Sequence, residues 1–203
     1  KQDGLNASRA RRQNPRDISN EWADSADDMR NRLVIGYVWD IPWGKSLTGV
    51  LGAVLNGWQF SGIATLNSGS PLYVSQDGDT LNTDDAGDVH PDLVSGQDPM
   101  LPGSDRTIQR WFNTAAFTRA TVTYGNSPRN PVVGPGRKLL DVSLAKAFTV
   151  TGQHRIQFRW DMFNALNTNN WNNPNTVLGN ANFGRITSAQ AAREMQLSLR
   201  YTF

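Results

Sequence analysis

The 203-residue sequence has no cysteine, so disulfide bonds and thiolate metal sites are excluded. Its two histidines, His90 and His154, lie far apart and lack the partners of a metal site or a catalytic triad. We expect both to be polar surface residues. A phosphate-loop-like stretch, WDIPWGKS, and the Ser-x-x-Lys spacing in SLAK lack the sequence context that those motifs require. An enzyme is therefore the class of protein that the sequence favours least.

Long hydrophobic runs are missing as well. No window approaches about 18 consecutive apolar residues, so no transmembrane helix is predicted. An excess of one charge is also missing, because twenty Lys and Arg face eighteen Asp and Glu. This balance does not favour nucleic acid as a partner. The sequence does not exclude a membrane β-barrel, since alternating strands lower the mean hydropathy of every window.

The sequence does contain alternation of apolar and polar residues. It occurs in five segments, at residues 32–41, 58–67, 140–148, 155–164 and 195–203, and Lys146 breaks the apolar row near the end of the third. A period of two indicates β-strands, and a tilted strand of about 9–11 residues is long enough to cross a bilayer. We therefore predict an all-β fold, an antiparallel segment of a transmembrane barrel with about five strands.

The connections between these strands differ in length. Residues 69–138 and 168–190 form long polar links, 42–57 is intermediate, and 149–153 is a tight hairpin turn. Bacterial outer-membrane barrels have long extracellular loops and short periplasmic turns. This asymmetry predicts that the chain end at Phe203 lies on the periplasmic side.

The first periplasmic connection has its own pattern. Apolar residues recur at helical spacing, at Leu47, Val50, Leu51, Val54 and Leu55. This predicts one short helix, lying either at the membrane interface or on a soluble core. Three tryptophans fall near the same end of the strands and suit an aromatic girdle, with a Trp-rich soluble core as the alternative: Trp39, Trp43 and Trp58.

The polar faces of the strands carry charges of both signs. In a barrel these charges would face the lumen, as a salt-bridge network or as contacts to a ligand or plug: Asp141, Arg155, Arg159, Asp161, Glu194 and Arg200. In the hairpin we expect Ser143 opposite Arg159, with Asp141 diagonal to Arg159.

Two loops offer candidate ligand residues on the extracellular side. An aspartate-rich loop supplies oxygen ligands that a calcium ion could use, although their spacing does not fit an EF-hand: Asp77, Asp79, Asp84, Asp85 and Asp88. The Asn-rich loop around Trp171 could bind a sugar by stacking and hydrogen bonding. Solvated loops are the alternative in both cases, and no other metal or cofactor is expected.

The order of motifs resembles the C-terminal end of TonB-dependent outer-membrane receptors, in the branch with a carboxypeptidase-regulatory-like N-terminal domain. The motifs are RLVIGYVWDIPWGK, GWQFSGIATLNSGSPLYV, WFNTAAF, GNSPRNPVVGPGRKLLDVSLAKAF, FRWDMFNALNTNNWNNPN, NFGRITSA and MQLSLRYTF. The resemblance implies a 22-stranded barrel around a plug, which imports a bulky nutrient of the siderophore, glycan or peptide class with energy from TonB. Here we expect only the last five strands, with TonB acting through a plug outside this sequence.

The resemblance also implies a role for the last segment. Outer-membrane barrels end in an alternating strand with a terminal aromatic residue, which the barrel-assembly machinery reads. The matching residues are Met195, Leu197, Leu199, Tyr201 and Phe203. Edge pairing of an extended segment gives this signal a physical basis.

The resulting expectation divides the chain into an extracellular or leading segment, 1–30, and a barrel portion, 31–203, in the Gram-negative outer membrane. Its partners would be the lipid bilayer, the assembly machinery, and the remaining strands and plug. Five strands leave two open edges, so we expect them not to fold stably alone. Two alternatives are a soluble β-sheet carbohydrate-binding module and a barrel-anchored surface adhesin.

Overall fold

The computed structural model describes residues 12–14, 16–82, 89–152 and 154–203. The chain forms two compact units. The loop unit comprises Lys1–Arg30, Ser68–Gly136 and Trp171–Ala189, and the sheet unit comprises Asn31–Asn67, Arg137–Asn170 and Gln190–Phe203. Three sequence-distant segments therefore meet in each unit.

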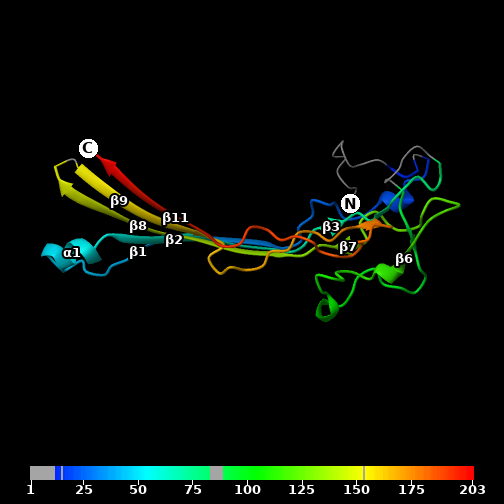
Figure 1. Cartoon of the computed structure of the whole chain (residues 1–203), viewed down its shortest axis with the longest axis horizontal. Coiled ribbons are helices and arrows are strands. Elements are labelled where there is room, and N and C mark those ends of the chain that lie inside the picture. Colours follow the sequence, from blue (N-terminus) through cyan, green and yellow to red (C-terminus); the bar gives the residue numbers. More distant parts are fainter. Residues whose placement is uncertain (1–11, 15, 83–88, 153) are drawn as a thin grey trace. The chain divides into compact units, whose positions relative to one another are not determined.

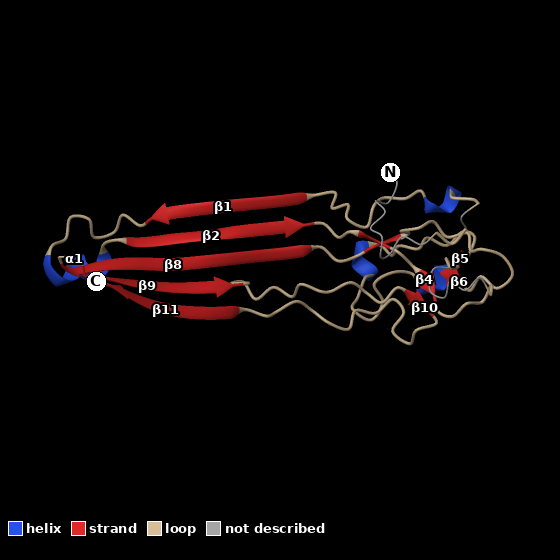
Figure 2. Cartoon of the chain, turned by 90° about the horizontal axis from the view of Figure 1, so that it is seen from above, coloured by secondary structure: helices blue, strands red, loops and turns tan. Residues whose placement is uncertain are grey.

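The sheet unit is built on one five-stranded antiparallel sheet, as the alternation predicts (Figures 1 and 2). Its strands, in spatial order, are β1 (Arg32–Asp40), β2 (Trp58–Asn67), β8 (Arg137–Thr151), β9 (His154–Phe163) and β11 (Glu194–Thr202). Strands that follow one another along the chain are neighbours, and β1 and β11 form the two edges. The sheet does not close on itself.

The β8–β9 hairpin differs from the sequence-based expectation. Strand β8 continues to Thr151, which pairs with His154, so the turn is shorter than the predicted 149–153. An irregularity between Thr149 and Thr151 adjusts the register. The predicted pairing of Ser143 with Arg159 is therefore wrong, because Ser143 lies opposite Asp161. The difference is two residues, and a shift by two leaves every side chain on its predicted face.

Between β1 and β2 lies the one α-helix of the described residues, α1 (Gly49–Leu55). The backbone N–H of Asn56 donates to the carbonyl of Gly52 at 2.9 Å and closes the last turn. Gly57 follows with φ +77°, a left-handed conformation that favours glycine and ends the helix. The helical spacing of the apolar residues thus correctly predicts this element.

Within the residues that the structure describes, no helix has the length and apolar character needed to cross a membrane.

The loop unit contains short strands and turns. Its two-residue strands pair as β3 (Pro71–Leu72) with β7 (Val132–Val133), β4 (Ser75–Gln76) with β10 (Val177–Leu178), and β5 (Asp92–Leu93) with β6 (Phe117–Thr118). Its described residues also form three 3-10 turns, η1 (Ser19–Glu21), η2 (Gly103–Asp105) and η3 (Thr114–Ala116). The β4–β10 pair is parallel and joins two different connections of the sheet.

An aromatic core holds the loop unit together. The rings of Phe112, Phe117 and Phe183 lie 5.1–5.9 Å apart in edge-to-face arrangements. Val74, Ala116 and Val132 are the other buried members of the cluster, and Phe183 packs against it partly buried. Such ring geometry adds favourable electrostatics to the burial of apolar area. The long connections are therefore a folded body with its own core.

A buried polar cluster anchors the N-terminal segment to the loop unit. Arg129 donates to Glu21 at 2.6 Å, and both side chains are less than a tenth exposed. The side-chain amide of Gln13 donates to Gly125 at 2.8 Å and accepts from the N–H of His90 at 3.1 Å. His90 is fully buried, so its expected place at the surface is wrong. Its Nδ1 lies 2.7 Å from the carbonyl of Ser127, a polar environment that the sequence spacing does not reveal.

Candidate functional site

The pairing register gathers the alternating apolar residues of all five strands on one side of the sheet, here called the apolar face. In β1 and β2 this face carries Leu33, Ile35, Tyr37 and Trp39 beside Leu66, Ala64, Gly62 and Phe60. In β8, β9 and β11 it carries Leu140, Val142 and Leu144, then Phe158, Trp160 and Met162, then Met195, Leu197, Leu199 and Tyr201. Leu197 and Leu199 are 67% and 74% exposed. An apolar surface that is continuous over five strands must meet a partner that is not water.

Aromatic side chains are concentrated at one end of the apolar face, where α1 and the chain end also lie (Figure 2). Trp39 and Trp43 meet edge to face at 6.3 Å. Trp58 contacts Phe158 in the same way at 6.1 Å. Tyr201 stacks on His154, with its hydroxyl 2.5 Å from the ring nitrogen Nδ1. The structure thus brings the three predicted girdle tryptophans to one end of the sheet.

Lys146 interrupts this aromatic end with a cation. It lies on the apolar face directly opposite Trp58, yet only 2% of it is exposed. Its ammonium group donates to the carbonyl of Val54 at 2.7 Å and to that of Asn56. These carbonyls lie at the C-terminal end of α1, where backbone acceptors lack helical partners and the helix dipole favours a cation. The rings of Trp58 and Phe148 flank the ammonium at 5.3 and 4.7 Å.

The opposite side of the sheet, here called the charged face, carries the six predicted charged residues on three strands: Asp141, Arg155, Arg159, Asp161, Glu194 and Arg200. Arg159 forms an ion pair with Asp161, whose two carboxylate oxygens lie 2.9 Å from Nε. Asp141 accepts the backbone N–H of Asn164 at 2.9 Å instead of pairing with Arg159.

The charged face also carries exposed apolar residues toward β1. Val34, Val38 and Ile63 lie there with half or more of each side chain exposed. Toward β9 and β11, the same face has a hollow of about 440 Å³, which is lined by polar groups that include Arg155, Gln157 and Arg200. The charged face is therefore chemically mixed, unlike the apolar face.

The aspartate-rich loop is only partly covered by the described residues, and Asp84, Asp85 and Asp88 lie outside them. Asp77 forms an ion pair with Arg119, which also donates to the Asp77 carbonyl at 2.9 Å. Asp79 accepts the backbone N–H of Asn82 through its carbonyl. No group of three or more potential metal ligands is found in the described part of the chain. The Asp77 carboxylate is thus engaged by a guanidinium.

Trp171 lies elsewhere in the loop unit. It is half-buried and forms an isolated antiparallel bridge with Ala189. The neighbouring Asn172 donates through its side chain to the Ser188 hydroxyl at 2.8 Å. These contacts give the Asn-rich connection a defined shape around the indole ring.

Comparison with known proteins gives one family match, to the outer membrane beta barrel domain, over residues 1–196. The chain belongs to the outer membrane beta barrel domain family. This family places it in the Gram-negative outer membrane and confirms the predicted all-β fold class. No curated protein and no solved structure matches the chain. Membership in the outer membrane beta barrel domain family explains the apolar face, because such barrels turn alternating apolar residues toward lipid.

Lys146 is the residue whose contacts sequence reasoning misses. In sequence it is only a break in the apolar row of β8, and a single lysine near a strand end has no distinctive signal. What defines its role is the approach of α1, 90–92 residues earlier in the chain. Only Phe148, two residues later on the same row, is near it in sequence, and the second flanking ring, Trp58, comes from a different strand.

Proposed function

We propose that the chain forms the C-terminal strands of the barrel of a TonB-dependent outer-membrane receptor, a non-enzymatic protein for energised uptake of a bulky nutrient. The observation that carries the proposal is the five-strand sheet with one continuous apolar face and one charged face. The motif order from Arg32 to Phe203, which resembles this receptor branch, supports the finer assignment.

The folded loop unit supports a receptor over a simple pore. Its three segments are the chain before β1, the β2–β8 connection and the β9–β11 connection. They share a core around Phe112 and a buried ion pair of Glu21 and Arg129. A rigid body of this kind provides a preorganised surface for a bulky ligand. Trp171 remains the proposed contact for a sugar, and the aspartate-rich loop remains the proposed contact for a cation, with Asp77 itself paired to Arg119.

The charged face supports a filled barrel. Val34, Val38 and Ile63 on this face favour contact with another protein surface over water alone. We assign this role to a plug, which would also reach Arg155 and Arg200. The charges listed for the charged face then line the lumen wall.

The edges of the sheet support the proposed assembly. Strands β1 and β11 present unpaired backbone groups, which a membrane does not tolerate, so further strands must pair with both edges. Strand β11 and Phe203 are the proposed signal for the barrel-assembly machinery, because β11 alternates throughout and forms an edge.

Uptake by cells with and without the gene tests this function. The probes are radiolabelled ferric siderophores, fluorescent oligosaccharides and fluorescent peptides, each with and without a protonophore. We expect deletion to abolish uptake of one class, the protonophore to have the same effect, and the intact gene to restore it. Uptake that is unchanged by deletion for every class, with loss of surface attachment instead, would replace the receptor with the adhesin alternative. Uptake that continues in the presence of the protonophore would argue for a passive pore.

A further inference from the structure

Helix α1 exposes an apolar side that no part of the described chain covers. Val50 is 81% exposed, Leu51 66% and Val54 53%. The helix has no charged residue in its sequence GVLGAVL. These side chains share one side of the helix, whereas Gly52 and Ala53 fall on the other side by the helical period. A wholly apolar exposed side is unusual for a turn that faces only water.

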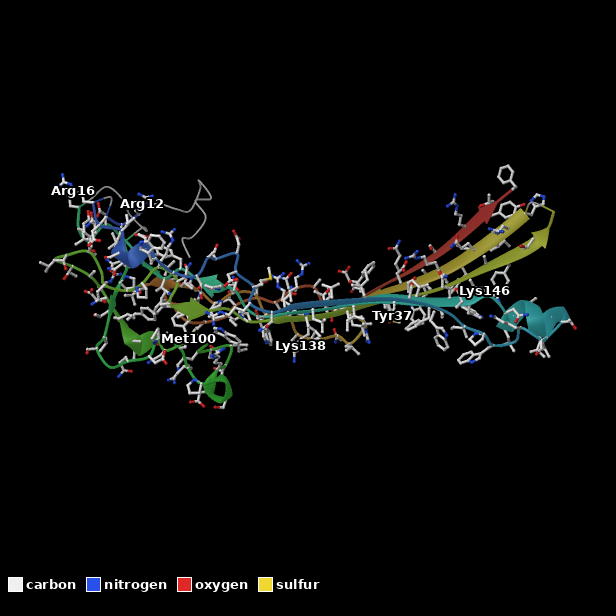
Figure 3. All side chains as sticks on the ribbon, turned by 180° about the vertical axis from the view of Figure 1, so that it is seen from behind. Arg12, Arg16, Tyr37, Met100, Lys138 and Lys146 are labelled. Carbon is white, nitrogen blue, oxygen red and sulfur yellow. The ribbon has the colours of Figure 1, made fainter. Side chains whose placement is uncertain are left out.

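The helix is held against the apolar face of the sheet by two side chains of that face. Lys146 donates to the carbonyls of Val54 and Asn56, and the indole N–H of Trp58 donates to Val54 at 2.9 Å. Figure 3 shows Lys146 beside the helix, whereas Lys138, also on the apolar face, lies toward the opposite end of β8. The exposed side of α1 is thus continuous with the aromatic end of the lipid-facing surface.

This continuity identifies the occupant of the exposed side. The aromatic rings mark the membrane–water interface, and Lys146 places its stem among them while its charge is bound by backbone carbonyls. An apolar helix at that level meets the boundary between headgroups and acyl chains. A protein partner would need polar contacts around the patch, which GVLGAVL does not offer.

We propose that α1 is an interfacial anchor embedded in the inner leaflet of the outer membrane. Phospholipid covers its exposed apolar side, and Lys146 is its positioning residue. The anchor fixes the depth of the β1–β2 hairpin in the bilayer. The proposal rests on the outer-membrane location and does not depend on the substrate or on TonB.

Site-specific fluorescence tests the proposal, and the chain has no cysteine of its own to interfere. The full-length barrel protein, purified with any cysteine outside these 203 residues changed to serine, carries one cysteine labelled with an environment-sensitive dye, in vesicles of phosphatidylethanolamine and phosphatidylglycerol. Doxyl nitroxides carried by the lipids, either near the headgroup or near the end of the acyl chain, report the depth of the dye. We expect the dye at Leu51→Cys to be quenched at least about twofold more by the shallow nitroxide than the dye at Ala53→Cys, its matched control on the same helix.

Reference positions separate this proposal from the barrel assignment. Leu199→Cys reports the apolar face of β11, and Val122→Cys, 87% exposed in the loop unit, reports water. Quenching at position 199 with none at position 51 contradicts the anchor role of α1 and leaves the barrel assignment intact. No quenching at either position contradicts both the anchor role and the membrane assignment of the sheet.

A second pair of variants tests the positioning role. Lys146→Met removes the donors while keeping the length of the side chain, and we expect quenching at position 51 to fall to about half or less. Lys146→Arg keeps a donor and should restore most of it. Quenching at position 199 shows that each variant has inserted. Unchanged quenching at position 51 in Lys146→Met overturns the role of Lys146.

Discussion

Tyr37 covers Gly62, its direct partner on the neighbouring strand of the apolar face. A Cβ atom at Gly62 would lie 2.6 Å from the Tyr37 hydroxyl and 2.5 Å from the backbone carbonyl of Asp141. The aromatic ring fills the space that the missing side chain leaves, an arrangement that stabilises glycine within a sheet. This fit joins β1, β2 and β8.

We predict that Gly62→Ala destabilises the sheet by about 1–3 kcal/mol, because the added methyl group forces the ring and the backbone apart. The measurement is the free energy of unfolding of the full-length barrel protein by urea in lipid vesicles. Gly36→Ala is the matched control, since a Cβ there meets nothing within 4 Å. Equal losses in the two variants would contradict the assigned fit of Tyr37 on Gly62.

An added positive charge should destabilise the barrel on one side of β11 and be tolerated on the other. Leu197→Arg places a cation near the middle of the strand on the apolar face and should cost about 2–4 kcal/mol at the bilayer centre. Ser198→Arg, one residue later and on the charged face, should insert normally. The folded fraction of the full-length barrel protein after insertion into vesicles measures both, and a normal yield for Leu197→Arg would argue against lipid contact there.

The buried ion pair of the loop unit should be more sensitive than an exposed one. Glu21→Ala leaves the charge of Arg129 buried, and loss of one member of such a pair costs about 3–5 kcal/mol. Faster cleavage of the loop unit by proteinase K measures the effect. Arg30→Ala is the control, because its pair with Asp24 is mostly exposed and should contribute little. Indistinguishable cleavage of the two variants would remove Glu21 from the role assigned to it.

Asn170 continues the sheet with its side chain. Its amide accepts from the Lys138 N–H at 2.7 Å and donates to the Lys138 carbonyl at 2.9 Å, as a paired strand residue would. Asn170→Ala should cost about 1–3 kcal/mol, since two backbone groups lose their partner. Hydrogen exchange at the start of β8 should accelerate, whereas the exposed Asn169→Ala should leave it unchanged. Slow exchange in Asn170→Ala would show that Lys138 is satisfied in another way.

The faces of the sheet could be predicted from the sequence because they depend only on parity. The hairpin register was two residues off, with Asp161 in the place expected for Arg159, yet both stayed on the charged face. The register itself was not predictable, because it depends on the irregularity after Thr149 and on a tighter turn. Alternation thus predicts which face of the sheet a residue occupies more reliably than it predicts which residue lies opposite on the next strand.

The loop unit could not be predicted from local pattern. Its strands are two residues long, too short for any period, and its core joins Phe112 to Phe183. From the sequence alone, His90 is predicted to be a surface histidine, and Lys146 is only a break in an apolar row. Both predictions miss the contacts of these residues, because the partners come from remote segments. Tertiary contacts, which no window of sequence contains, decide these positions.

The core of the loop unit has a consequence for the order in which the chain folds. Phe183 comes from the last connection before β11, and the side chain of Gln13 reaches Gly125, 112 residues away. Closing such distant contacts is slow, because the chain loses the entropy of a long loop before the contact forms. The loop unit is therefore completed only after residue 183 has reached the periplasm, shortly before β11 itself arrives. A chain exported only up to that point would carry Phe112 and Phe117 without the ring of Phe183, a surface that periplasmic chaperones should bind.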